Sequence, residues 1–227
     1  VADIKSERWP ASRRNGWPAS VGIRSELADA LAVWMQAMGV ERAALVGNSL
    51  GCEVLVELSI VHPQLIDRLV LQGPTPDPEA RGLIRQMMGF FAIAAFERWS
   101  LAWVALTDYA RGGIRRYILT LRSMVDNQIG QKACQVKQPT LVVWGTRDYI
   151  VPYAFVTRLT GLLPRGRLAV IPGAAHGINY SHPEAFTAVL LPFLSGAPRM
   201  PAAPKPIPAT GAGCRSISSH HAPAADS

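Results

Sequence analysis

A glycine-bounded serine, Gly47-Asn48-Ser49-Leu50-Gly51, most limits what this chain can fold into. The apolar run at 42–48 before it is typical of a short strand covered on both faces. The pattern after it predicts a helix over 50–61, which His62-Pro63 ends. A turn this sharp between strand and helix strains the serine backbone and favours glycine two positions away on either side, at Gly47 and Gly51.

Such a turn can make a serine reactive. The amino-terminal end of the following helix directs its N–H groups and the positive end of its dipole at the reacting oxygen. We therefore expect Ser49 to act as a nucleophile, with the N–H of Leu50 as the first donor to an oxyanion. Asn48 is the remaining residue of this nucleophile turn. A nucleophilic serine also needs a base, and an acid that orients the base.

Three histidines lie in the part of the chain that has a folded pattern, and one of them fits the role of base. His62 and His182 each precede a proline at a predicted helix boundary, which is a helix-end position. His176 instead lies in the loop 173–177, directly after a predicted strand. Functional loops of open α/β sheets lie at the carboxyl ends of strands, so His176 is the predicted base.

The predicted acid is Asp148, which follows the apolar run 141–144 through a tight turn. Asp77 also comes just after a strand and competes with it for this role. The chain order serine, aspartate, histidine is the one expected for a nucleophile on a strand-to-helix turn, and it favours Asp148.

The remaining pattern alternates short apolar strands with helices, which predicts an α/β fold: a mostly parallel sheet with helices on both faces. A helix from Ser25, ended by Gly39, is expected to bury one apolar stripe. The stripe consists of Leu27, Leu31, Trp34, Met35 and Met38. Further strands are predicted at 66–72, 140–144 and 167–171, and further helices at 152–163 and 182–194.

Composition divides the chain into segments. Residues 1–24 are irregular, and residues 25–74 together with 137–195 form the α/β core. Residues 75–136 interrupt the strand–helix alternation with bulky apolar side chains in a helical pattern. Residues 196–227 are rich in Pro and Ala and cannot bury enough apolar surface to offset their ordering entropy, so we expect a disordered tail.

Charge and cysteine content exclude several functions. The net charge of +7 divides into +3 for residues 1–24, +2 for 199–227 and only +2 for the body between them, so we expect no nucleic-acid partner. The apolar stretch 87–106 carries two charges at its centre, which favours a soluble helix pair over a membrane span. Three scattered cysteines form neither a disulfide framework nor a metal-ligand motif; we expect three free thiols, a cytoplasmic location, no metal and no cofactor.

Three stretches together resemble the signature regions of the α/β-hydrolase superfamily. They are Ala43–Cys52, Val142–Pro152 and Pro172–His176. The resemblance implies a Ser–Asp–His hydrolase with Ser49, Asp148 and His176 in the triad, and a helical cap at 75–136. Asn48 and the spacing are similar to the branch that contains meta-cleavage-product (carbon–carbon bond) hydrolases, small-molecule esterases and cofactor-free haloperoxidases. Gly177 stands where the first of these groups has Trp.

One departure from the family pattern concerns the strands before the nucleophile. The family has three or four strands and an oxyanion loop of His-Gly type ahead of the helix that begins near Ser25, and no such segment precedes that helix here. We therefore expect an N-terminally incomplete fold with an open sheet edge beside Ser49 and no assigned second oxyanion donor. Truncation is the favoured explanation, and coverage of the edge by another segment is the alternative.

Two functional hypotheses follow. The first is a serine hydrolase that cleaves a small or medium apolar ester, thioester or related carbonyl substrate through an acyl-enzyme on Ser49. The alternative is a non-catalytic, truncated module that binds a small apolar ligand. Under both hypotheses the partner is a small molecule, without nucleic acid or membrane.

Overall fold

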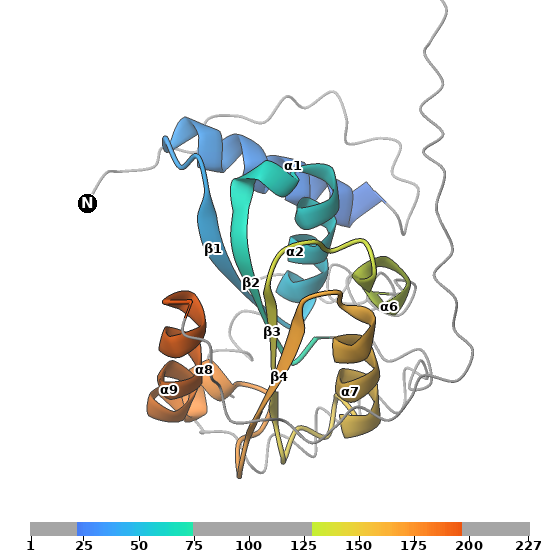
Figure 1. Ribbon diagram of the computed structural model, residues 1–227, viewed down its shortest axis with the longest axis vertical. Helices are drawn as coiled ribbons and strands as arrows, with labels where there is room; N and C mark the ends of the chain where they lie inside the picture. Colours follow the sequence, from blue (N-terminus) through green and yellow to red (C-terminus); the bar gives the residue numbers. More distant parts are fainter. Residues whose placement is uncertain (1–21, 75–128, 197–227) are drawn as a thin grey trace, which may run out of the picture.

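A computed structural model describes residues 22–74 and 129–196, and within these ranges the strands form one parallel sheet (Figure 1). Its four strands are ordered β1-β2-β3-β4, the same as their order along the chain. They are β1 (Ala43–Asn48), β2 (Ile66–Gln72), β3 (Thr140–Gly145) and β4 (Gly166–Ile171). The predicted parallel sheet is confirmed, with each strand end within one residue of its expected position.

Helices cover both faces of this sheet (Figure 1). On one face lie α1 (Gly22–Ala37), α2 (Leu50–Val61), α6 (Ile129–Ala133) and α7 (Tyr153–Leu162). On the other lie α8 (Ile178–Ser181) and α9 (Pro183–Leu194), and a 3-10 turn, η2 (Pro63–Leu65), joins α2 to β2. Each crossover between parallel strands therefore carries a helix, as βαβ connections require.

Strand side chains alternate between two hydrophobic cores. In β2, Leu69 and Leu71 pack with the core under α1, α2 and α7, while Val70 packs with the core under α8 and α9. All three are fully buried. Such burial on both faces explains why the strands read as continuous apolar runs.

The buried face of α1 matches the predicted stripe only in part. Met35 is buried and Leu31 partly buried, as predicted, but Leu27, Trp34 and Met38 are 42%, 52% and 62% exposed. Ala28 and Ala32, which lie outside the stripe, are buried instead. The helix also begins at Gly22, so Ser25 lies inside it and is not its cap. Small side chains on the buried face let the α1 and α2 backbones approach closely, so packing against α2 overrode the bulkier stripe.

The predicted burial of β1 on both faces is also wrong. Ala44, Val46 and Asn48 are exposed, and Val46 is 49% exposed. In the part of the chain that the structure describes, β1 pairs only with β2, which makes it an edge strand. Within those residues, the expected open edge beside Ser49 is present.

Several expectations fall on residues whose placement is not described. The irregular segment 1–24, the cap 75–136 and the tail 196–227 lie wholly or largely outside the described residues, as does the competing acid Asp77. In 22–74 and 129–196, no helix is long and apolar enough to cross a membrane.

The expectation of three free thiols is wrong. Cys52 is a free, buried thiol, but Cys134 is disulfide-bonded. Spacing along the chain does not determine which sulfur atoms meet in space, because a disulfide requires only that the two backbones come within a few ångströms.

Candidate active site

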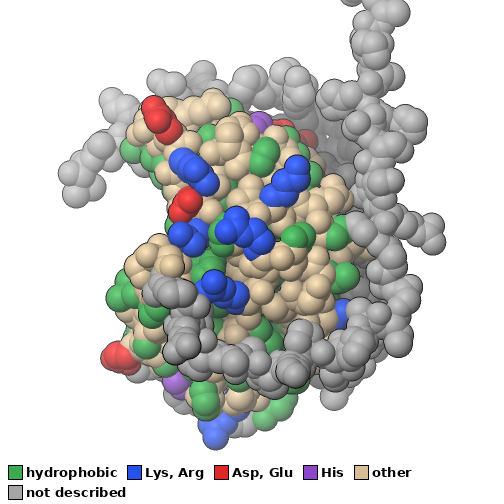
Figure 2. Space-filling model, in the orientation of Figure 1, with side chains coloured by type: hydrophobic (Ala, Val, Ile, Leu, Met, Phe, Trp, Pro, Cys, Tyr) green, Lys and Arg blue, Asp and Glu red, His purple; other side chains and the backbone are tan. Residues whose placement is uncertain are grey.

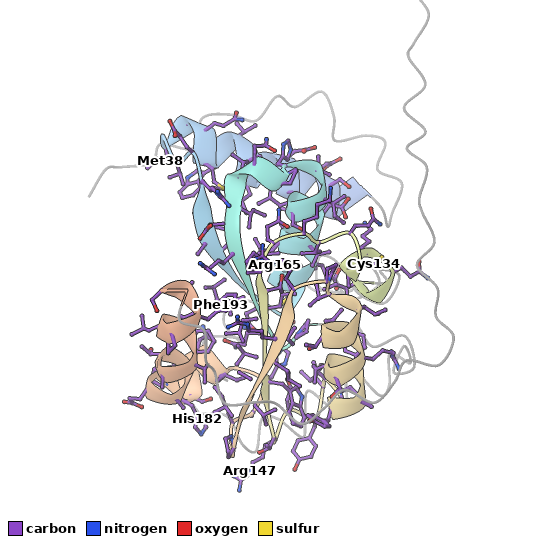
Figure 3. All side chains as sticks on the ribbon, viewed as in Figure 1. Met38, Cys134, Arg147, Arg165, His182 and Phe193 are labelled. Atoms are coloured by element: carbon purple, nitrogen blue, oxygen red, sulfur yellow. The ribbon has the colours of Figure 1, made fainter. Side chains whose placement is uncertain are left out.

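The predicted triad residues follow three strands of the sheet at the same edge. Ser49 comes directly after β1, Asp148 follows β3 and His176 follows β4. Because the strands are parallel, their carboxyl ends share one edge, at the lower end of the strands in Figure 1. In Figure 3 the labelled Arg147, the neighbour of Asp148, lies at this lower end. Ligand sites in open α/β sheets lie at the same edge.

Ser49 has the strained backbone that the motif predicts. Its φ of 52° and ψ of −118° make it the one non-glycine residue with positive φ among those described. Such a conformation costs about 1–3 kcal/mol and persists only where surrounding contacts enforce it. One such contact is the Ser49 N–H, which donates to the Gln72 carbonyl over 3.0 Å. This bond holds the turn against the end of β2.

The two motif glycines have different roles. A Cβ on Gly47 would lie 2.8 Å from the backbone carbonyl carbon of Gly51 and 2.9 Å from the N of Cys52, so α2 can pack on the turn only if residue 47 is glycine. A Cβ on Gly51 would have no described atom within 4 Å. The expected need for glycine is therefore confirmed at Gly47 and wrong at Gly51, because residue 51 points away from the strand.

A hydrogen bond joins Asp148 and His176. The Nδ1 of His176 lies 2.8 Å from Oδ2 of Asp148, whose side chain is fully buried, while that of His176 is 14% exposed. The other oxygen, Oδ1, accepts the N–H groups of Ile150 (3.0 Å) and Val151 (3.1 Å). A carboxylate held at both oxygens fixes the orientation of the imidazole, whose other nitrogen, Nε2, then faces away from Asp148.

Gly73, directly after β2, packs against the Asp148–His176 pair. Gly73 has φ 52°, and a Cβ there would lie 2.8 Å from Cε1 of His176 and 3.4 Å from Oδ2 of Asp148. Only glycine allows the histidine ring to sit this close to the backbone. A strand-ending glycine is common, and its contact with His176 is visible only in three dimensions.

Gln72 connects the serine turn to the histidine loop, and the sequence analysis did not identify it. Its Nε2 lies within hydrogen-bonding distance of the carbonyl of His176 (3.1 Å), Oδ1 of Asn179 (3.0 Å) and Oδ1 of Asn48 (3.3 Å). Its side chain is 1% exposed. The available signal was a glutamine ending an otherwise apolar strand, since a buried amide needs partners.

Cys52 lies behind the serine turn but is not suited to act as a nucleophile. Its Sγ contacts the carbonyls of Gly47 and Gln72, both at 3.3 Å. Complete burial, and secondarily the charge of Glu53, raise the pKa of this thiol far above its ordinary value. Since the thiolate is the reactive form, Cys52 has a packing role.

The other site predictions concern helix ends. Ser49 is the N-cap of α2, so the N–H of Leu50 belongs to the first turn, where helical N–H groups have no intrahelical acceptor. His62 ends α2 and its Nε2 lies 2.9 Å from Oδ1 of Asp29 in α1, while His182 lies between α8 and α9. Both therefore have the helix-end positions that the sequence predicts.

Within 22–74 and 129–196 no three His, Cys, Asp or Glu side chains form a cluster that could hold a metal.

Comparison with known proteins places this geometry in a family context. A family model described as "Alpha/beta hydrolase family" matches residues 9–189. The chain is 28% identical over 211 residues to a 2-hydroxy-6-oxononadienedioate/2-hydroxy-6-oxononatrienedioate hydrolase of Paraburkholderia phymatum, covering 79% of this chain and 73% of that protein. It is 26% identical over 192 residues to a putative carbamate hydrolase, RutD, of Caulobacter sp., covering 75% and 72%.

A solved structure shares the fold. The structure of Est816, described as an N-acyl homoserine lactone degrading enzyme, aligns with a TM-score of 0.61 at 22% identity and covers 77% of this chain and 76% of its own. At this level of identity the similarity establishes the fold.

Proposed function

Because this chain belongs to the alpha/beta hydrolase family, a family whose members here are named hydrolases, we propose that it is a serine hydrolase acting through Ser49, His176 and Asp148. The substrate class is a small or medium apolar carbonyl compound, such as an ester or thioester. The names of the relatives above support a carbonyl substrate, because the compounds they name each contain a carbonyl group.

In the proposed mechanism, Oγ of Ser49 attacks the carbonyl carbon while Nε2 of His176 accepts the serine proton. Asp148 keeps the proton on Nδ1 and stabilises the imidazolium. The N–H of Leu50 donates to the developing oxyanion. His176 then protonates the leaving group, and water, deprotonated by the same nitrogen, hydrolyses the acyl-enzyme and restores Ser49.

The observation that carries this proposal is the 2.8 Å bond between His176 and the buried Asp148, at the sheet edge where Ser49 has its strained backbone. A turn aspartate without a catalytic role would have no need to place an oxygen on an imidazole. The cost of burying a carboxylate is offset here by three hydrogen bonds.

The test is labelling by a fluorophosphonate probe combined with hydrolysis of short p-nitrophenyl esters. Ser49→Ala should abolish both labelling and hydrolysis. Ser195→Ala is the matched control, since Ser195 caps the carboxyl end of α9 and, among the described residues, its Oγ bonds to the nearby Pro192 carbonyl. Hydrolysis by Ser49→Ala at the parent rate would overturn the assignment.

A second candidate is a module that binds a small apolar ligand without turnover. The open edge of β1, next to Ser49 in the described residues, favours it, because a second oxyanion donor is not assigned there. Loss of one such donor costs about 10²–10³ in rate. Tight binding of an apolar ester without fluorophosphonate labelling would favour this candidate over the hydrolase.

A further inference from the structure

A pocket lies at the end of the sheet opposite the triad. Its cavity of about 370 Å³ is lined by Arg68, Pro139, Arg165, Gly166, Arg167, Phe193 and Gly196. The labelled Arg165 and Phe193 mark this region in Figure 3, well separated from Arg147 at the triad end. Figure 2 shows Lys and Arg side chains gathered over the middle of the same face. The pocket is therefore separate from the proposed catalytic site.

Strand register brings the three arginines of this pocket to one face. Arg68 precedes Leu69, which pairs with Thr140, and Thr140 pairs with Gly166 at the start of β4. Arg68 is two residues from Val70, and Arg167 is two residues from Ala169, both of which face α9. Because side chains alternate along a strand, both arginines project on the α9 side. Arg165 comes directly before β4 and lines the same pocket.

The arginines of this pocket outnumber the carboxylates that pair with them in the described residues. Arg68 lies 3.3 Å from Asp67, but Asp67 is shared with Arg42 at 3.2 Å. Neither Arg165 nor Arg167 forms an ion pair with a residue of 22–74 or 129–196. Like charges placed together repel unless an anion joins them.

Arg68 is held at the wall of the pocket from two sides. Its Nε lies 3.3 Å from Oδ2 of Asp67, and its side chain is 26% exposed. The guanidinium packs over the ring of Phe193, 5.8 Å from its centroid, which holds the arginine in place. A guanidinium fixed in this way at the pocket wall can donate charge-assisted hydrogen bonds to an oxyanion in the pocket.

We propose that Arg68, Arg165 and Arg167 form a binding site for a phosphate monoester dianion. A tetrahedral dianion offers several acceptor oxygens to planar guanidinium forks, and arginine is the side chain best suited to bidentate phosphate contacts. The cavity volume lies within the range of small-molecule sites. The ligand is a soluble small molecule that carries the phosphate, and it binds independently of the chemistry at Ser49.

The test is calorimetric titration of the full chain with inorganic phosphate and with glycerol 3-phosphate, at constant ionic strength with chloride as the reference anion. The double variant Arg165→Gln/Arg167→Gln should weaken the affinity for both at least about tenfold, because it removes charge-assisted hydrogen bonds. Lys137→Gln is the matched control: it removes a nearby exposed positive charge that does not line the pocket, and should change the affinity less than about twofold.

Fluorophosphonate labelling of Ser49 and the thermal melting temperature in chloride monitor folding of each variant. No binding heat from the parent chain with either anion would overturn the proposal, as would equal weakening by Lys137→Gln and by the double variant. Sedimentation with phosphatidylcholine vesicles containing phosphatidic acid distinguishes the ligand source. Binding to free anions without co-sedimentation supports a soluble ligand, whereas strong co-sedimentation lost in the double variant assigns the same site to a lipid headgroup and overturns the soluble one.

Discussion

At the scale of single residues, the site depends on side chains that fix the positions of the Ser49 turn and the His176 loop relative to each other. Gln72 is the central one, because its backbone carbonyl holds the Ser49 N–H while its side-chain amide contacts the carbonyl of His176. One buried residue thus contacts both loops that carry the proposed chemistry. The amide also reaches Asn179 in α8, the helix that follows the histidine loop.

We predict that Gln72→Met lowers kcat about tenfold with little change in KM, because the histidine loop loses its hydrogen bonds to β2 while the substrate pocket keeps its volume. The measurement is steady-state hydrolysis of a p-nitrophenyl ester. Gln138→Met is the control: Gln138 is also buried, and its Nε2 donates to the carbonyl of Pro63, away from the triad. Both variants should lose about 1–3 kcal/mol of stability, and an unchanged kcat in Gln72→Met would exclude a positioning role.

At the scale of elements, the contact between β1 and α2 decides the geometry of the serine turn. We predict that Gly47→Ala destabilises the protein by about 3 kcal/mol, since the new Cβ would overlap the backbone of α2. Gly51→Ala should change stability by less than about 1 kcal/mol, in the stabilising direction, because alanine is the better helix former and its Cβ meets no described atom. Urea unfolding measures both. Equal effects of the two substitutions would contradict the packing described here.

The orientation of α1 gives a second prediction at this scale. Met35 is 1% exposed and Trp34 is 52% exposed. Met35→Ala should therefore cost about 2–5 kcal/mol, as expected for a cavity in a core. Trp34→Ala should cost less than about 1 kcal/mol despite removing the larger side chain. Both residues belong to the predicted stripe, so a loss of stability in Trp34→Ala as large as in Met35→Ala, measured by thermal unfolding, would show that Trp34 is buried as the stripe requires.

At the scale of the whole molecule, the reactivity of the Cys52 thiol can be used to measure unfolding. Cys52, in the first turn of α2, is completely buried against the ends of β1 and β2, and burial raises the pKa of its thiol. The raised pKa keeps the thiol protonated and unreactive at neutral pH, and only opening of the structure exposes it.

We therefore predict that Cys52 reacts with a disulfide reagent such as DTNB only as fast as the protein unfolds. The rate should rise with guanidinium in parallel with the loss of secondary structure, with the modified cysteine identified by peptide mapping. Rapid modification of Cys52 in the native protein would show that the packing behind the serine turn is open.

Local sequence patterns were enough to predict most of the strands and helices described here. Strand and helix positions follow from local periodicity and from turn residues, so β2 and α2 have the predicted bounds. The pairing of His176 with Asp148 was also predictable, because parallel strands bring their carboxyl ends to one edge whatever the side-chain details.

Tertiary packing alone decided the rest. The sequence shows an apolar stripe on α1, but which face is buried depends on how closely α1 approaches α2. In the structure Ala28 and Ala32 are buried, and Trp34 is exposed. The roles of Gln72 and Gly73 depend on a loop about a hundred residues away along the chain, whose His176 carbonyl lies 3.1 Å from Nε2 of Gln72 and whose His176 ring leaves no room for a Cβ at Gly73. Periodicity specifies each element by itself, whereas contacts between elements arise from shape and burial summed over the whole fold, which no local pattern contains.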